Sequence, residues 1–117
     1  MAALTTQTPT PAGLAASYAS CSGGGDTVPN NGKVYLHIKN ASGGSITVTV
    51  AKTISTPQNI PGYGLVTISD ISVAIAAGAE KFIGPIDPNA YNSTSGTGTV
   101  AITYSGVTSL TIAAIQF

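Results

Sequence analysis

The chain has 117 residues, of which 43% are hydrophobic and only 7% are charged, and its formal net charge is zero. Typical soluble domains carry about 25% charged residues, so this composition describes at most one domain with few charges on its surface. Four lysines, no arginine and a neutral balance exclude the clustered cations that phosphate neutralisation needs. We therefore expect no nucleic-acid partner.

The low charge leaves two interpretations open. No stretch approaches the roughly 18 uninterrupted apolar residues of a membrane helix, and residues 1–13 lack the basic-then-apolar pattern of a secretory signal. The single Cys21 excludes an internal disulfide. Because near-zero net charge favours association, the chain is either a secreted or glycosylated module or a subunit whose surface is covered by neighbours.

Residues 1–32 differ in character from the rest of the chain. Pro9 and Pro11 make the TTQTPTP run extended and unsuited to helix, while CSGGGD and VPNNG are typical of flexible turns. The segment is either a disordered leader or an extended N-terminal arm that becomes ordered on a neighbouring subunit, and its lack of charge favours the arm. We expect residues 33–117 to form a β domain that folds without it. The expected anchors of the arm are Leu4, Leu14, Tyr18 and Val28.

Residues 33–50 carry the clearest pattern in the sequence. KVYLHIK and ITVTV alternate apolar and polar residues, as half-buried strands do, and the NASGGS between them tolerates positive φ. We predict a β-hairpin. Its first strand turns a polar face outward with Tyr35, His37 and Lys39, and this face is a plausible docking surface. The apolar positions of the two strands are Val34, Leu36, Ile38, Ile46, Val48 and Val50.

Short strands continue to the end of the chain. Gly84 and Pro85 mark one of them as an edge strand or a bulge, and the last is apolar on both faces, so it needs a central place or an outer cover. Good helix formers are scarce. These features predict an all-β fold, a β-sandwich or jelly-roll-like barrel, with an immunoglobulin-like sandwich as the alternative. The further strand signals lie at residues 65–69, 71–76, 80–86, 99–104 and 109–117.

No motif in the chain carries catalytic chemistry, so we expect no enzyme, no cofactor and no metal. His37 is the only histidine, whereas structural zinc takes four Cys or His ligands. The acidic residues are isolated in sequence, and the absence of tryptophan disfavours a glycosidase cleft. Tyr63 and Tyr91 lie on two long loops, where a protein contact is favoured over stacking on a sugar ring.

Three segments resemble small virion proteins of tailed bacteriophages, of the capsid decoration (cement) type: NNGKVYLHIKNASGGSITVTV, SVAIAAGAEKFIGPI and VAITYSGVTSLTIAAIQF. The shared pattern is an N-G-x-x-x-L-x-I/V-K-N strand, a Gly-rich turn, a T-V-T strand and a later A-G-x-x-x-x-I-G-P strand. It covers residues 30–117. The resemblance implies a homo-oligomer, with a trimer favoured, that binds the major capsid protein on the virion surface after synthesis in the host cytoplasm. It implies no catalytic residue.

We therefore expect a structural protein that stabilises a capsid by bridging major capsid subunits. The alternatives are a carbohydrate- or receptor-binding module and a minor head-fibre, neck or tail subunit. The residues expected at an interface are Leu4, Leu14, Tyr18, Val28, Tyr35, His37, Tyr63, Tyr91, Ile115 and Phe117.

Overall fold

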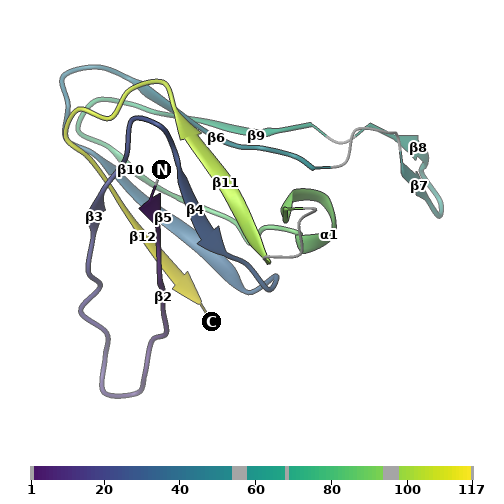
Figure 1. Cartoon of the computed structure of the whole chain (residues 1–117), viewed down its shortest axis with the longest axis horizontal. Helices are drawn as coiled ribbons and strands as arrows, with labels where there is room; N and C mark the ends of the chain where they lie inside the picture. The colour runs from purple at the N-terminus through teal and green to yellow at the C-terminus, as the bar shows by residue number, and fades with distance from the viewer. Residues whose placement is uncertain (1, 54–57, 68, 94–97, 117) are drawn as a thin grey trace.

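The computed structural model describes residues 2–53, 58–67, 69–93 and 98–116, and it contains two β-sheets packed as a sandwich (Figure 1). One helical turn, α1 (Pro88–Tyr91), accompanies the strands. The strands are β1 (Ala2–Ala3), β2 (Thr6–Gln7), β3 (Ala19–Ser20), β4 (Asp26–Pro29), β5 (Val34–Asn40), β6 (Ile46–Val50), β7 (Gln58–Ile60), β8 (Gly64–Val66), β9 (Ile71–Ile75), β10 (Glu80–Ile83), β11 (Thr99–Tyr104) and β12 (Leu110–Gln116).

The first sheet has the order β1-β4-β11-β6-β9, and the second has the order β10-β5-β12-β2, with β3 also paired to β12. The short strands β1 and β2 pair in parallel with β4 and β12, while the other pairs in both sheets are antiparallel. Antiparallel pairing throughout the main strands agrees with the all-β class predicted from sequence.

The connections identify the sandwich as a jelly roll. Along β3, β4, β5, β6, β9, β10, β11 and β12, the chain changes sheet at every step except between β6 and β9. Numbered in that order, the strands form sheets 1-8-3-6 and 2-7-4-5, which is the jelly-roll arrangement of eight strands. The predicted sandwich is confirmed, and its topology is the jelly-roll form.

The immunoglobulin-like alternative has different strand neighbours. In that fold the first strand lies beside the second, and the last lies beside the one before it. Here the first strand, β3, pairs with β12 instead of β4, and the last strand, β12, pairs with β5 instead of β11. The strand neighbours therefore distinguish this chain from an immunoglobulin-like sandwich.

The hairpin predicted over residues 33–50 is wrong, although both of its strands form. β5 lies in the second sheet and β6 in the first, so the turn between them crosses the sandwich. Buried Asn40 shapes this crossing, since its Nδ2 donates to the carbonyls of Gly44 and Ile75 at 2.9 Å and its Oδ1 accepts from Ser42. Alternation gives each strand one apolar face whether the two strands pair or face each other across a core.

The hydrophobic core lies between the sheets. Alternate residues of each main strand point inward, as the period-two pattern predicts. The second sheet and its connections contribute Val34, Leu36, Ile38, Ile83, Ile86, Leu110, Ile112 and Ala114. The first sheet contributes Val28, Ile46, Val48, Val50, Ile75, Val100 and Ile102.

The last strand, β12, takes a central place, as its two apolar faces required. β5 pairs with its whole length on one side, and β2 and β3 pair with parts of it on the other. Its outward Ile115 is only 5% exposed. β10, predicted as an edge strand or a bulge, stands at the end of the second sheet.

Much of the predicted arm is paired within this chain. β1 extends the first sheet beside β4, while β2 and β3 extend the second beside β12. β4 pairs with β11, and its Val28 is fully buried in the core. A domain that began at residue 33 would leave β11 without this neighbour and the core without Val28.

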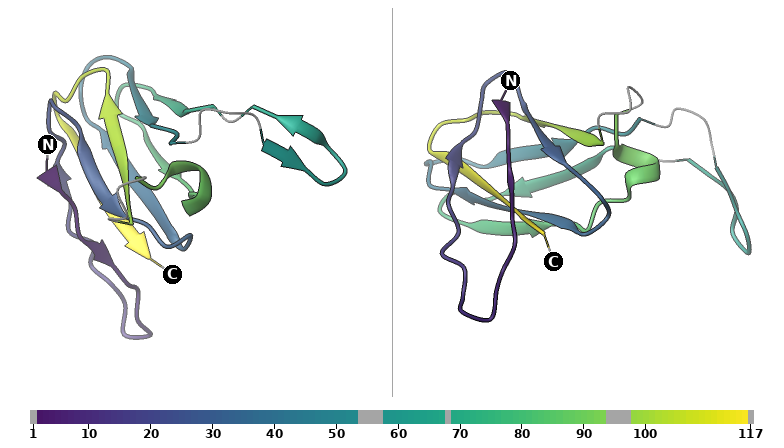
Figure 2. Two further views of the ribbon diagram at one scale, coloured as in Figure 1. Left: turned by 45° about the vertical axis from the view of Figure 1, so that its right-hand side comes forward. Right: turned by 60° about the horizontal axis from the view of Figure 1, so that its bottom comes forward.

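Two segments project from the sandwich on different sides (Figures 1 and 2). The N-terminal loop, residues 8–18, connects β2 to β3 and extends past one side of the second sheet. The β7–β8 hairpin, residues 58–66, lies between β6 and β9 in sequence and pairs only within itself among the described strands. It stands away from the sandwich at the opposite end from β2 and β3.

Candidate functional site

Aromatic side chains gather on the outer face of the second sheet. Alternation turns Tyr35 and His37 of β5 outward, and strand pairing places Phe82 of β10 beside His37. The His37 and Phe82 rings stack with centroids 4.1 Å apart and planes 12° apart, and Tyr35 meets Phe82 edge-on at 5.7 Å. Tyr18, just before β3, approaches His37 edge-on at 5.4 Å. We call Tyr18, Tyr35, His37 and Phe82 the aromatic face.

His37 is buried at the centre of this face and joins three segments of the chain. Tyr18 Oη lies 2.6 Å from His37 Nδ1, a hydrogen bond, and Glu80 Oε1 lies 3.3 Å from Nε2, an ion-pair distance without hydrogen-bond geometry. Lys39 Nζ lies 4.1 Å from the centre of the Tyr18 ring, a cation–π contact. These contacts fix the imidazole ring in place and put one charge of each sign beside the aromatic face.

Phe82 is the exposed member of the aromatic face. Its side chain is 65% exposed, although one side of its ring is packed on His37. A side chain held this way loses little conformational freedom when a partner covers it. The aromatic face therefore offers a rigid apolar anchor.

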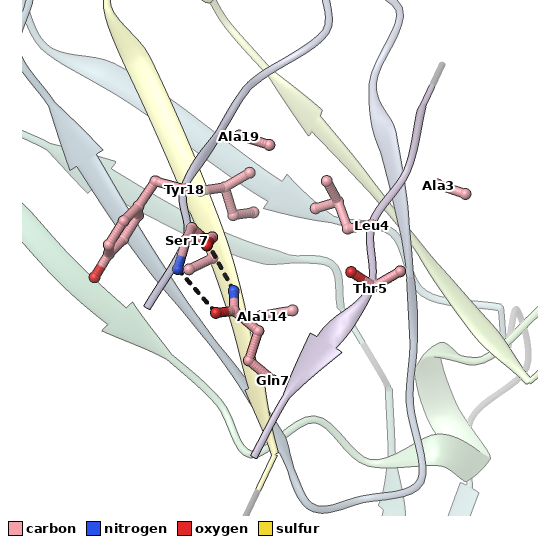
Figure 3. A pocket seen from close by; sticks show the side chains of 10 residues that line it. Ala3, Leu4, Thr5, Gln7, Ser17, Tyr18, Ala19 and Ala114 are labelled. Carbon is pink, nitrogen blue, oxygen red and sulfur yellow. Dashed lines mark hydrogen bonds between the residues drawn. The ribbon is translucent and has the colours of Figure 1, made fainter. Parts of the chain in front are cut away.

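A second candidate surface is a groove of about 350 Å³ between β2, β3 and β12 (Figure 3). Gln7 joins its two walls, because its Nε2 donates to the Ser17 carbonyl and its Oε1 accepts from the Ser17 N–H, both at 2.8 Å. None of the lining residues is charged. They are Ala3, Leu4, Thr5, Gln7, Ser17, Tyr18, Ala19, Ile112, Ala113 and Ala114.

A third candidate surface is the β7–β8 hairpin. Tyr63 and Leu65 are 82% and 75% exposed, and they are the most exposed large apolar side chains among the described residues. Gly62 and Gly64 flank Tyr63 with φ of 86° and 79°, a conformation that glycine adopts without strain. The turn therefore holds an aromatic ring out in solvent.

A buried polar cluster at the start of β4 is structural. Tyr104 donates to Asp26 Oδ2 at 2.6 Å, and the Ser22 N–H donates to the same oxygen at 3.2 Å. Burial raises the pKa of the Cys21 thiol to about 11, and burial with the hydrogen bond to Asp26 raises the pKa of Tyr104 above its ordinary value. Because the thiolate is the reactive form of cysteine, this thiol is a poor nucleophile at neutral pH.

The structure brings together three of the residues expected at an interface. Tyr18, Tyr35 and His37 meet on the aromatic face. Leu4 lines the groove and also packs against the core, and Leu14 stands exposed on the N-terminal loop.

The other expected residues are separate from that face. Val28 and Ile115 are buried within the chain. Tyr63 is exposed on the β7–β8 hairpin, whereas Tyr91 packs against the core and its hydroxyl donates to the Ser69 carbonyl at 2.8 Å. The two tyrosines thus lie in different settings. Phe117 lies outside the described residues.

Sequence reasoning missed Phe82 and Leu65. Phe82 is two residues from Glu80 in the strand signal at residues 80–86 and shares its face, so the outward position of Phe82 was readable from the period of the strand. Leu65 was assigned to a strand, and nothing in its local sequence shows that this strand leaves the sandwich. The Asp26–Tyr104 pair joins residues 78 positions apart, and no local signal connects them.

Among the described residues, no group of three His, Cys, Asp or Glu side chains could hold a metal ion. In the same part of the chain, no helix is long and apolar enough to cross a membrane. Comparison with protein-family models, curated proteins and solved structures finds no match. The surfaces described above are therefore the basis for assigning a function.

Proposed function

We propose that this chain is a structural virion protein that decorates a bacteriophage capsid and stabilises it by bridging major capsid subunits. The observation that carries the proposal is the aromatic face, where Phe82 is exposed yet held rigidly against His37. The proposed location is the capsid surface, and the proposed partner is the major capsid protein.

The aromatic face has the make-up of an interface centre. Aromatic residues are enriched at the buried centres of protein interfaces, while charges are depleted there and gather at the rim. Here Phe82 and Tyr35 form the apolar middle, and Glu80 and Lys39 border it. Only six other charged residues occur in this chain, so few other surfaces could form a charged contact with a partner.

The fold and the sequence pattern support the same assignment. Jelly rolls form viral capsid domains as well as lectin domains, so the fold alone does not decide between them. The resemblance of residues 30–117 to phage decoration proteins favours the virion. Binding only to the assembled shell would add the binding free energy to that state and so stabilise it.

The proposal is tested by co-sedimentation with expanded, undecorated capsids. Phe82→Ala removes the anchor, and we expect the dissociation constant to rise about 30-fold, the effect of losing about 2 kcal/mol at a hot spot. Ser72→Ala, at an exposed position of β9 in the other sheet, is the matched control and should bind like wild type. Wild-type protein that fails to bind at micromolar concentration would overturn the proposal.

A carbohydrate-binding role is the second candidate, and the same face favours it. An exposed aromatic ring beside a carboxylate and an ammonium group can stack on a sugar and hydrogen-bond its hydroxyls, as Phe82, Glu80 and Lys39 are placed to do. A glycan array distinguishes the two roles. Hits that disappear in Phe82→Ala would favour the carbohydrate, and an array without hits would remove it.

A further inference from the structure

We propose that copies of this chain associate head to tail, with the β7–β8 hairpin of one copy packed into the groove beside β12 of the next. The partner is thus a second copy of the same chain. Neither the hairpin nor the groove includes Phe82, the proposed capsid anchor. This inference therefore does not depend on the proposed contact with a capsid.

The β7–β8 hairpin would gain stability from a partner. A two-stranded hairpin on its own is marginally stable in water, and each of these strands has three residues. Tyr63 and Leu65 on the hairpin are largely exposed, and the surrounding residues 53–69 include no charged residue. Covering Tyr63 and Leu65 would bury apolar area without desolvating any charge on the hairpin.

The groove fits such an apolar projection. Its volume of about 350 Å³ lies at the lower end of the range for ligand pockets, which is enough for more than one large side chain of a hairpin tip. Ile112 and Ala113 of β12 are buried and close the floor of the groove, while Leu4 and Ala19 offer apolar surface on its walls. The Gln7–Ser17 hydrogen bonds hold these walls together. A preformed site of this kind loses little entropy when it is filled.

The placement of the two surfaces makes the contact intermolecular. The hairpin projects from one end of the sandwich, and β2 and β3 lie at the opposite end (Figures 1 and 2). The groove is lined by residues of these two strands. One copy therefore cannot fill its own groove. A contact between two different surfaces is heterologous, and its repetition gives a closed ring or an open chain according to the rotation between copies.

A second copy suits both surfaces because neither carries a charge. The hairpin, residues 58–66, and the groove lining are both uncharged, and the net charge of the chain is zero, so no repulsion opposes self-association. A charged partner segment would lose hydration in the groove without gaining an opposite charge.

Two complementary variants test the inference by analytical ultracentrifugation of the purified protein. Tyr63→Asp replaces the apolar contact residue of the hairpin with a charge and leaves the groove intact. Ala19→Arg blocks the groove and leaves the hairpin intact. We expect wild type to sediment above the 11.6 kDa monomer, with a mass that rises with concentration. Each variant alone should be monomeric. Mixed together, they should form a 1:1 pair and nothing larger, because the intact hairpin of the Ala19→Arg protein can bind the intact groove of the Tyr63→Asp protein and no second contact is possible.

Controls separate this outcome from misfolding and from added charge. Thr108→Asp adds the same charge at an exposed turn and should associate like wild type. Thr5→Arg, on another wall of the groove, replaces Ala19→Arg should that variant fail to fold by circular dichroism. A wild type that is monomeric up to millimolar concentration, a Tyr63→Asp protein that associates normally, or a mixture that does not pair would each overturn the inference. Capsid binding by the groove variants reports separately on the proposed function.

Discussion

Two buried groups, Cys21 and Tyr104, make the stability of this fold depend on pH in the alkaline range. The pKa of Cys21 rises from its ordinary value of 9.0 to about 11, and that of Tyr104 rises above its ordinary value of 10.0, chiefly because burial disfavours the charged forms. As pH rises, the unfolded chain therefore loses these protons before the folded chain does. Their contribution to stability is complete below pH 9 and is lost as pH rises toward the folded-state values.

We expect the free energy of unfolding to fall above pH 9, by up to about 1.4 kcal/mol per pH unit for each group that titrates only in the unfolded chain. Cys21→Ala should flatten the part of this fall between pH 9 and 11, and Tyr104→Phe the part above pH 10. Urea unfolding at a series of pH values measures both slopes. Parallel curves for wild type and Cys21→Ala would contradict this account.

At the scale of secondary-structure elements, local pattern fixes where strands occur but not which strands pair. The period of two located β5, β6, β9, β11 and β12 closely, because inward residues must alternate with outward ones. The same period is satisfied by a hairpin and by a turn that crosses between sheets. The side chain of Asn40 bonds to the carbonyl of Ile75, 35 residues away, in the crossing turn, and that contact is not visible in sequence.

Asn40→Ala tests the role of this residue in the crossing turn. Removing the side chain leaves the Ile75 carbonyl without this buried donor, so we expect a loss of about 1–3 kcal/mol in the free energy of unfolding. Ser45→Ala, an exposed change in the same turn, should alter it little. Equal stability of the two variants in urea titrations would show that the turn does not depend on Asn40.

At the scale of the whole molecule, composition and turn pattern predicted the class of fold. The order of the strands depends on long-range pairing, which the sequence does not show. Few charges, many β-branched residues and Gly-rich turns were enough for an all-β sandwich. The place of β4 in the first sheet was not predictable, because Pro29 and the glycines before Asp26 make that segment look like a linker. Two members of the aromatic face, Tyr35 and His37, were predictable because alternation turns them outward. Phe82 and Tyr18 contact them through strand pairing and the path of the N-terminal segment, which the sequence does not show.

Truncation separates the dispensable part of the N-terminus from the part that belongs to the core. Removing residues 1–17 spares β3 and β4, and we expect a folded protein with cooperative thermal unfolding. Removing residues 1–30 deletes β4 and Val28, which is fully buried, so cooperative unfolding should be lost. Circular dichroism melts of the two proteins provide the comparison. A cooperative melt of the shorter protein would mean that the domain begins at residue 33 after all.

Electron cryomicroscopy of virions assembled with this protein tests the central claim most directly, since it shows where the protein sits and which surface it uses. We predict density on the outside of the capsid shell at sites between major capsid subunits, with the face formed by β5 and β10 turned toward the shell. The Phe82→Ala protein should occupy those sites poorly, whereas Ser72→Ala should fill them. Density at the neck, tail or fibres, or none on the virion, would contradict a role in capsid decoration.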